Sequence, residues 1–550
     1  MSAMTPMTRP FVARRRPLSL ASLAALGALA VLAHASARGQ EAGTGVDANA
    51  SAAVGGKASG STGGRKGLSV TPRVSVTETW TDNLTLAPDG ARDKAFITAI
   101  SPGITINSNS GWLRGVFDYT LDGLIYTKSP EKSRVQNQLN TKLTGELVPQ
   151  ALFVDVTGNI SQQSMSAFGQ QSPSSQLDSP NRTETRTLQV SPYWRGTLGQ
   201  FATFELRASG QIRDSSDGGT GLGTASSGDS KEGQLSLNLR GPQGRTLNWG
   251  LSATTQRVHY DQTGVDNRTS TALGSLYWIP DVDWTLGVNA GVERSDYFGK
   301  DTTAVYGVNF RWTPTPRTRI DGDWQRHSYG NSHLLSLEHR MSQISLRAVN
   351  SQSVVTANTP SGLGTNYQLL DQQFQASEPD PVKRDQLVRQ LLALMGLSPD
   401  AITGNGFISN AASLQRRTEV SVAYNGQRLT ATLSGSDSTS SRLGLAPTGT
   451  GDLSLTDRLR MRGASVALGY RLTPLSTASV SYTRQHSSGD GVGSTDMKSL
   501  QANVAIRLGP RTDANLGLRH TTSTDKVFVA NLGGSGYREN ALFASLSQRF

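Results

Sequence analysis

Residues 541–550 alternate between apolar and polar side chains and end on phenylalanine. Successive side chains of a β-strand point to opposite faces, so this segment predicts a strand with one apolar and one polar face. Leu542, Leu546 and Phe550 share the apolar face, on which Gln548 replaces a further apolar residue. Such an ending is typical of bacterial outer-membrane β-barrels, whose strands face lipid on one side and water on the other. We expect Leu542, Leu546 and Phe550 to form a C-terminal insertion signal.

The same alternation recurs along residues 67–550. In residues 284–293, the even positions carry Trp, Leu, Val, Ala and Val, while Asn289 and Glu293 lie among the odd ones. The connections alternate between short turns and long polar loops; examples are the turns 109–111, 199–200 and 509–510 and the loops 165–182 and 441–456. Short periplasmic turns and long outer loops are typical of outer-membrane barrels. The pattern predicts an all-β, transmembrane, antiparallel up-and-down β-barrel.

The number of strands follows from parity. Both ends of the barrel are expected on the periplasmic side, so the number must be even, whereas a first count gives 21. Dividing one long segment at Ser342–Gln343, into 333–341 and 344–355, gives 22 and restores the alternation of short and long connections. We predict 22 strands, within a range of 18–22 if weak segments such as 231–240 merge.

Six of the eight tryptophans lie close to a predicted short turn: Trp112, Trp194, Trp249, Trp278, Trp284 and Trp312. Indole rings prefer the interface between membrane and water, so these residues predict an aromatic girdle at the periplasmic rim. A soluble β-sandwich also alternates but gives no reason for this placement.

The N-terminus predicts export. Three arginines, 14–16, precede an apolar stretch and a small-residue cleavage site, so residues 1–37 are expected to be a signal peptide. An uncleaved anchor is the alternative, but the apolar stretch is shorter than the ~20 residues of a membrane span. Residues 38–66 are rich in Gly, Ala and Ser and predict a disordered periplasmic lead-in. The mean hydropathy of −0.36 excludes a helical membrane protein, and localisation in the outer membrane is expected.

The segment 356–411 is the longest connection. Within it, Pro381 to Gly396 predicts a helix, with Asp380 as N-cap and Gly396 as its end. Its apolar face carries Val388, Leu391, Leu392 and Met395. A lumen of about 22 strands is wide, and barrels of that size are plugged. We therefore expect this insert to form either a plug inside the lumen or a cap outside it.

Nine arginines are expected to face the lumen close to short turns: Arg114, Arg195, Arg240, Arg311, Arg317, Arg319, Arg471, Arg507 and Arg549. Together they predict a basic ring at the periplasmic mouth, which would favour anions such as acidic polysaccharide. The alternative is that they pair with wall carboxylates such as Asp321 and Asp323.

The sequence gives no support for catalysis or for a bound metal or cofactor. The six histidines beyond the leader lack the spacing of metal ligands, and no nucleophile elbow, Walker loop or zinc-protease motif occurs. The chain contains no cysteine. Its net charge of +11 falls to +7 without the leader's four arginines, and the remaining basic residues are not gathered in a run. We therefore expect neither an enzyme nor a nucleic-acid-binding protein.

Two short segments carry a family resemblance. Residues 74–84, Val-Ser-Val-Thr-Glu-Thr-Trp-Thr-Asp-Asn-Leu, and residues 101–104, Ser-Pro-Gly-Ile, resemble the opening of the PEP-CTERM system-associated outer-membrane β-barrel family. The helical segment 381–397 and the final Phe550 are similar as well. This family is related to β-barrel porins encoded in exopolysaccharide loci. The resemblance implies a barrel that works beside exopolysaccharide assembly, and it transfers no catalytic residue.

Three functions are compatible with these patterns. The first is an outer-membrane channel associated with exopolysaccharide biosynthesis and export, with periplasmic export proteins and the polysaccharide as partners. The second is a general or solute-specific porin, and the third is a non-conducting structural or adhesive surface barrel. All three imply contact with outer-membrane lipid and with the barrel-assembly machinery.

Overall fold

The computed structural model describes residues 67–550 except for 216–227, 243, 262, 298–300, 357–363, most of 366–401, 405–406, 410, 445–450 and 528–535. The predicted signal peptide, 1–37, and lead-in, 38–66, lie outside the described residues.

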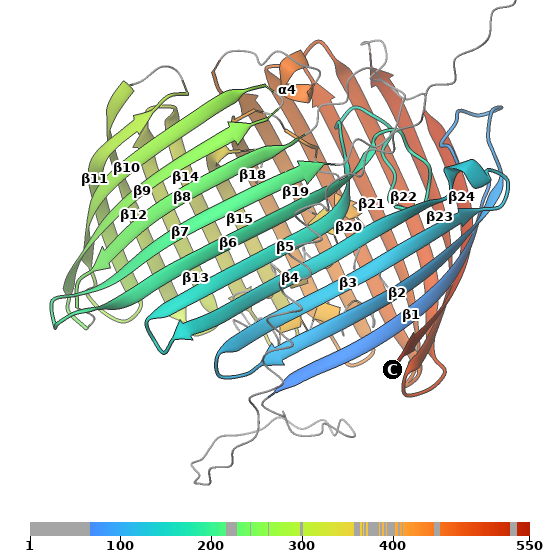
Figure 1. The fold of residues 1–550 in the computed structure, drawn as a ribbon, viewed down its shortest axis with the longest axis horizontal. Helices are drawn as coiled ribbons and strands as arrows, with labels where there is room; N and C mark the ends of the chain where they lie inside the picture. Colours follow the sequence, from blue (N-terminus) through green and yellow to red (C-terminus); the bar gives the residue numbers. More distant parts are fainter. Residues whose placement is uncertain are drawn as a thin grey trace, which may run out of the picture. The chain divides into compact units, whose positions relative to one another are not determined.

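Twenty-two antiparallel strands pair in sequence order into one sheet, and β1 also pairs with β24, so the sheet closes into a barrel (Figure 1). The first eleven strands are β1 (Leu68–Thr81), β2 (Ala95–Asn109), β3 (Leu113–Tyr126), β4 (Arg134–Val148), β5 (Leu152–Ser164), β6 (Arg182–Leu198), β7 (Ala202–Ser215), β8 (Ser230–Arg240), β9 (Leu247–Tyr260), β10 (Val265–Trp278) and β11 (Trp284–Ser295). The other eleven are β12 (Asp301–Thr315), β13 (Thr318–His327), β14 (Gly330–Arg340), β15 (Ile344–Val355), β18 (Ser413–Asn425), β19 (Leu429–Arg442), β20 (Arg458–Thr473), β21 (Ser476–Gly489), β22 (Gly493–Arg507), β23 (Thr512–Val527) and β24 (Tyr537–Arg549). The predicted barrel of 22 strands is confirmed.

The barrel carries its apolar side chains on the outside. Val288 on β11 pairs with Val308 on β12, and both side chains are more than half exposed. Their neighbours Asn289 and Glu293 point to the other face and are 8% and 2% exposed. A soluble protein buries its apolar side chains and leaves most of its charges in water, so this inverted arrangement is stable where lipid surrounds the wall. The strands therefore form a membrane-spanning barrel.

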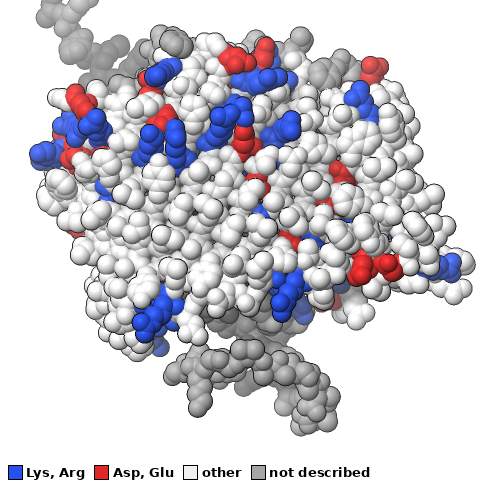
Figure 2. Space-filling view, turned by 180° about the vertical axis from the view of Figure 1, so that it is seen from behind, with Lys and Arg blue, Asp and Glu red and all other residues white. Residues whose placement is uncertain are grey.

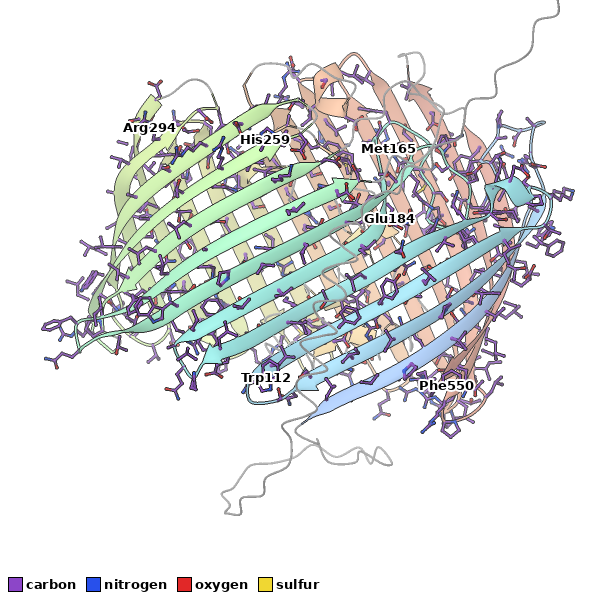
Figure 3. The ribbon with its side chains drawn as sticks, viewed as in Figure 1. Trp112, Met165, Glu184, His259, Arg294 and Phe550 are labelled. Carbon is purple, nitrogen blue, oxygen red and sulfur yellow. The ribbon has the colours of Figure 1, made fainter. Side chains whose placement is uncertain are left out.

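The short turns and the long loops lie at opposite ends of the barrel (Figure 1). Trp112 and Phe550 mark the short-turn end, while His259 and Arg294 lie at the loop end (Figure 3). Near the short turns, Trp284 and Trp312 are paired across β11 and β12 and stack with ring centroids 5.1 Å apart. The six tryptophans of the predicted girdle lie close to short turns, while Trp80 lies at the loop end of β1.

The last strand, β24, pairs with β1 in a register that keeps the apolar side chains of both strands on the outer face. Leu546 of β24 pairs with Val76 of β1, and Leu542 pairs with Trp80. The backbone N–H of Phe550 donates to the carbonyl oxygen of Pro72, 2.9 Å away. Leu542, Leu546 and Phe550 face outward, so the strand presents an apolar face to lipid that only Gln548 interrupts.

The helical content exceeds the single helix that the sequence predicts. A 3₁₀ helix, η1 (Pro130–Lys132), and a one-turn helix, α4 (Asp452–Leu455), lie in two loops. In the insert, helical residues occur around 384–392, as expected, and also around 367–374. The insert also contains a small sheet of β16 (Gly364–Thr365) and β17 (Ile402–Gly404). Among the described residues, no helix is long and apolar enough to cross a bilayer.

Candidate functional site: the barrel interior

The insert touches the inner wall of the barrel. Asp118 of β3 points inward and accepts two hydrogen bonds from Arg73 of β1, each 2.8 Å long. Arg389 of the insert places its Nη2 atom 3.2 Å from the same carboxylate. One wall carboxylate is therefore shared by a wall arginine and an insert arginine.

An apolar contact fixes the insert to another sector of the wall. Leu370, Val388 and Leu392 form a buried cluster against which Ala467 of β20 packs. Along the closed sheet, β20 and β3 are separated by β21, β22, β23, β24, β1 and β2. The helical part of the insert thus contacts two well-separated strands from inside the barrel. Of the four residues predicted for its apolar face, Val388 and Leu392 are buried, while Leu391 and Met395 lie outside the described residues.

Within the insert, Arg389 is held by its own helical neighbours. Its Nε atom donates to Asp385 at 2.9 Å, and its guanidinium lies over the ring of Tyr367. The hydroxyl of Tyr367 also donates to Asp385, at 2.7 Å. Burial raises the pKa of Asp385, and the positive charge of Arg389 opposes that rise. These contacts within the insert hold the guanidinium of Arg389 in the position from which it reaches Asp118.

A second inward element is the loop between β5 and β6, residues 165–181. Three inward-facing wall side chains bond to it: Thr79 donates to the side chain of Gln176 at 2.9 Å, Tyr126 donates to its carbonyl, and Tyr537 donates to the carbonyl of Gln171. These side chains belong to β1, β3 and β24, so the loop crosses the seam where the barrel closes. The sequence predicts this loop only as a long polar connection.

The loops also pack against one another at the loop end. Phe407 of the insert, Phe168 of the β5–β6 loop and Leu453 of α4 belong to one buried cluster, which rests on Leu459 and Met461 of β20. Three connections far apart in sequence therefore share a hydrophobic core inside the rim.

One carboxyl is buried at this junction. Asp452 of α4 accepts hydrogen bonds from the hydroxyl of Ser166 at 2.6 Å and from the backbone N–H of Ala167 at 2.7 Å. Burial raises the pKa of Asp452 to about 6, and the two hydrogen bonds oppose that rise. The contact joins α4 to the β5–β6 loop.

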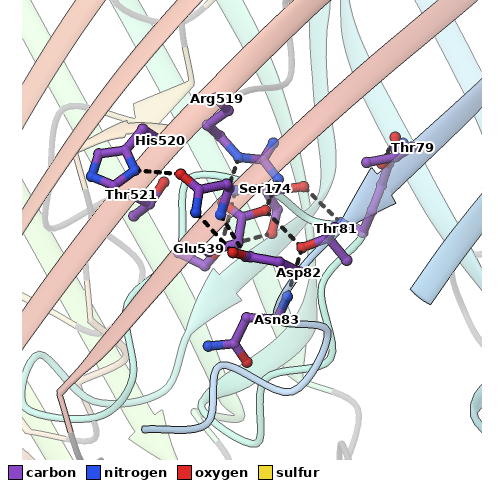
Figure 4. A network of polar contacts seen from close by, with 12 residues as sticks. Thr79, Thr81, Asp82, Asn83, Ser174, Arg519, His520, Thr521 and Glu539 are labelled. Carbon is purple, nitrogen blue, oxygen red and sulfur yellow. Dashed lines mark hydrogen bonds and ion pairs between the residues drawn. The ribbon is translucent and has the colours of Figure 1, made fainter. Parts of the chain in front are cut away.

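A buried ion pair lies beside the seam. Glu539 of β24 is fully buried and accepts hydrogen bonds from Arg519 of β23, at 2.8 and 3.1 Å, and from Thr81 of β1, at 3.1 Å (Figure 4). The carboxylate therefore links the last two strands to the first.

The predicted basic ring is partly neutralised. Eight of its members occupy inward-facing positions on strands near the short turns, while Arg317 lies in the turn between β12 and β13. Four pair with carboxylates: Arg311 and Arg319 with Asp321, and Arg507 and Arg549 with Asp513.

The remaining ring arginines have no carboxylate partner among the described residues. Arg195 lies over the ring of Phe153, with its guanidinium carbon 4.2 Å from the ring centroid. Arg114, Arg240 and Arg471 are exposed near the rim. Asp323, which the sequence offers as a partner, instead accepts hydrogen bonds from Gln325. The mouth therefore combines free and neutralised cations.

Comparison with known proteins finds no matching family model and no matching curated protein. Solved outer-membrane proteins are similar in structure. The FrpB iron transporter from Neisseria meningitidis is 9% identical, with a TM-score of 0.45 over 88% of this chain and 82% of its own. The siderophore receptor PirA from Acinetobacter baumannii is 10% identical, with a TM-score of 0.43 over 87% and 80%. Similarity at this level assigns no function.

The sequence identifies the polar faces of the strands but not the contacts between the insert, the β5–β6 loop and the wall. Asp118 is recognisable as an inward-facing carboxylate, yet nothing in the sequence pairs it with Arg389. The inward folding of residues 165–181 leaves no periodic signal, because its contacts use backbone carbonyls and scattered Gln and Ser side chains. No group of three metal-ligating side chains occurs among the residues described.

Proposed function

We propose that the protein is an outer-membrane channel whose lumen is closed by the insert 356–411. The contact between Arg389 and Asp118 carries this proposal, because it places a helical segment of the insert against the lumen wall. A purely structural barrel has no need of a segment held inside it, and a segment that contacts both β3 and β20 would narrow the passage. We place the short turns on the periplasmic side of the outer membrane and the long loops on the outer side.

The cargo that we propose is an anionic extracellular polysaccharide. Two independent features support it: the resemblance of residues 74–84 and 101–104 to the PEP-CTERM-associated family, and the unpaired arginines at the short-turn mouth. Arg114, Arg240 and Arg471 would meet a polymer that enters from the periplasm, and their charge favours acidic sugars over neutral ones. Periplasmic export proteins would deliver the polymer to this mouth.

Planar-bilayer conductance tests the channel. The wild-type protein is expected to conduct rarely, while a variant in which 357–411 is replaced by a short Gly-Ser linker is expected to conduct steadily. Equal conductance of the two proteins would remove the insert from its proposed role, and no conductance from either would favour the structural barrel.

Polymer secretion tests the cargo separately. A strain lacking the gene is expected to lose extracellular acidic polysaccharide and to regain it with the wild-type gene. Normal secretion by the deletion strain, together with conductance by the purified protein, would favour a porin for small solutes.

A further inference from the structure

The outer surface of β19–β22 carries a cluster of charged side chains at the loop end. Figure 2 shows the back of the barrel, where basic and acidic residues gather along the upper rim above a broad zone with few charges. The cluster, here called the outer basic patch, consists of four permanent cations, one histidine and two carboxylates: Arg460, Arg462, Arg484, Lys498, His486, Asp437 and Asp496.

The strand register gives the position of the outer basic patch along the barrel wall, relative to the lipid-facing apolar residues. Tyr482 on β21 pairs with Leu500 on β22, and both are exposed members of the apolar outer face. Two residues further toward the loops on the same face, Arg484 pairs directly with Lys498. Two residues along a strand span about 7 Å. The first cations therefore lie one row above the lipid-facing apolar surface.

The next row continues the patch. Arg462 on β20 is paired with Asp437 on β19 and with His486 on β21, and His486 is paired with Asp496 on β22. Above that row, Arg460 faces the same side. All these positions follow the alternation of the outward-facing apolar residues, so the patch belongs to the lipid side and not to the lumen.

The two carboxylates do not neutralise the patch. Asp437 lies 2.5 Å from Arg460 and 3.5 Å from Arg462, while Asp496 lies 3.0 Å from Arg484 and 3.6 Å from Lys498. Each carboxylate is thus shared by two permanent cations, which leaves an excess of two positive charges before His486 is counted. The four cations remain about half exposed.

Pairing within the patch leaves part of its charge uncompensated. Arg484 and Lys498 face each other directly across two strands, and like charges in such a position destabilise a sheet. Asp496, which lies between them, can neutralise only one of the two. Beside a membrane, the anions at this height are lipid headgroups. Long basic side chains at the edge of an apolar band reach such groups while their methylene chains stay against lipid.

We propose that the outer basic patch binds the phosphate groups of an outer-leaflet glycolipid. Arg462, Arg484 and Lys498 supply the hydrogen-bond donors, and the apolar row at Tyr482 and Leu500 contacts the acyl chains. Arginine suits this role because its planar guanidinium can donate two parallel hydrogen bonds to one phosphate. The site requires the membrane orientation proposed above but does not require the lumen to conduct.

Lipid binding by the purified full-length protein in detergent tests the site. The probes are a glycolipid with two phosphate monoesters, its dephosphorylated form and inorganic phosphate, followed by native mass spectrometry. The wild-type protein is expected to prefer the phosphorylated glycolipid by about tenfold, which corresponds to about 1.4 kcal/mol. The triple variant R462Q/R484Q/K498Q is expected to lose this preference while Asp437 and Asp496 each keep one basic neighbour.

The matched control is R114Q/R240Q/R471Q, which removes three positive charges from the lumen side of the opposite rim. It is expected to keep the wild-type preference, and heat-modifiable migration on gels verifies that both variants fold. The proposal is overturned if the patch variant retains the preference, if the dephosphorylated glycolipid binds equally well, or if millimolar inorganic phosphate displaces the lipid. Loss of binding in the patch variant with unchanged conductance supports a lipid site that is separate from the channel.

Discussion

Arg389, in the insert, lies 3.2 Å from Asp118 on the wall of the barrel. The two residues are 271 positions apart in the sequence, and Asp118 on β3 is already bonded to Arg73 on β1, with β2 between the two strands. This contact ties a helical segment of the interior to the first strands of the sheet. Its removal is the mildest way to loosen the insert without altering the barrel.

Substitution Arg389→Gln is expected to raise the open fraction of the channel several-fold. The substitution removes the charge that pairs with Asp118 and with Asp385, and it leaves the apolar contacts of Val388 and Leu392 in place. Breaking a partly buried ion pair of this kind costs up to about 3 kcal/mol. Single-channel recording in planar bilayers provides the measurement. Arg207→Gln, on a wall arginine that pairs with Asp155, is the control and should conduct like the wild type.

Ion selectivity is expected to depend on the unpaired arginines of the short-turn mouth. In a channel that lacks 357–411, R114Q/R240Q/R471Q should lower the ratio of anion to cation permeability at least twofold, because a ring of charge sets the local ion concentration. R462Q/R484Q/K498Q removes the same charge from the lipid side and should leave the ratio unchanged. Reversal potentials in a salt gradient measure the ratio. Equal ratios in both variants and the parent would show that the mouth does not select.

Docking of α4 is expected to weaken as the pH rises. Burial raises the pKa of Asp452 from 3.8 to about 6. The carboxyl of Asp452 therefore binds its proton more tightly in the docked loop than in the free loop. The stability of the docked state falls as the pH rises from 3.8 to about 6, and it is lowest above pH 6. A shift of about two units corresponds to about 3 kcal/mol. After correction for intrinsic rates, amide hydrogen exchange in 165–167 and 451–456 should be slower at pH 5 than at pH 7.5.

Asp452→Asn is the control for this titration. Asparagine keeps one acceptor for the N–H of Ala167 and offers a donor to Ser166, so it resembles the protonated acid. Its exchange protection should be alike at both pH values. A wild-type pH dependence in this variant would assign the effect to another group.

The closure seam is expected to depend on the pair formed by Arg519 and Glu539. Both side chains are buried, and removing one member leaves an uncompensated charge, which costs about 3 to 5 kcal/mol. Glu539→Gln should therefore lower the temperature at which the barrel loses its heat-modifiable migration, and R519Q/E539Q should recover part of the loss. Glu205→Gln, at a more exposed pair on β7, should change stability by about 1 kcal/mol or less. Similar losses from E539Q and E205Q would contradict a special role for the seam.

The sequence predicts the wall of this barrel well because the wall is periodic. Strand β15 begins at Ile344 and ends at Val355, as the alternation and the parity argument require. The weak segment 231–240 is a full strand, β8, whose apolar residues Leu235, Leu237 and Leu239 were sufficient to define its outer face. Lipid on one side and water on the other constrain every second residue, so the pattern repeats strand after strand.

The interior is less predictable because its contacts join distant residues without a repeat. The helix around residue 388 can be foreseen from its apolar face, but its docking partner Ala467 is a small residue with no distinguishing neighbours. Asp513 neutralises part of the basic ring by pairing with Arg549. This ion pair can be recognised only when the register of β23 and β24 is known. Position in a closed sheet, and not residue type, decides which arginines remain free.

The loop 165–181 has a consequence for the order of assembly. Its anchors include Thr79 on the first strand and Tyr537 on the last, which become neighbours only after the two edges of the sheet have met. In a nascent chain whose sheet edges, β1 and β24, are not yet paired, the two anchors do not lie together. The loop can therefore settle only as a late step, and its settled state reports that the cylinder has been completed.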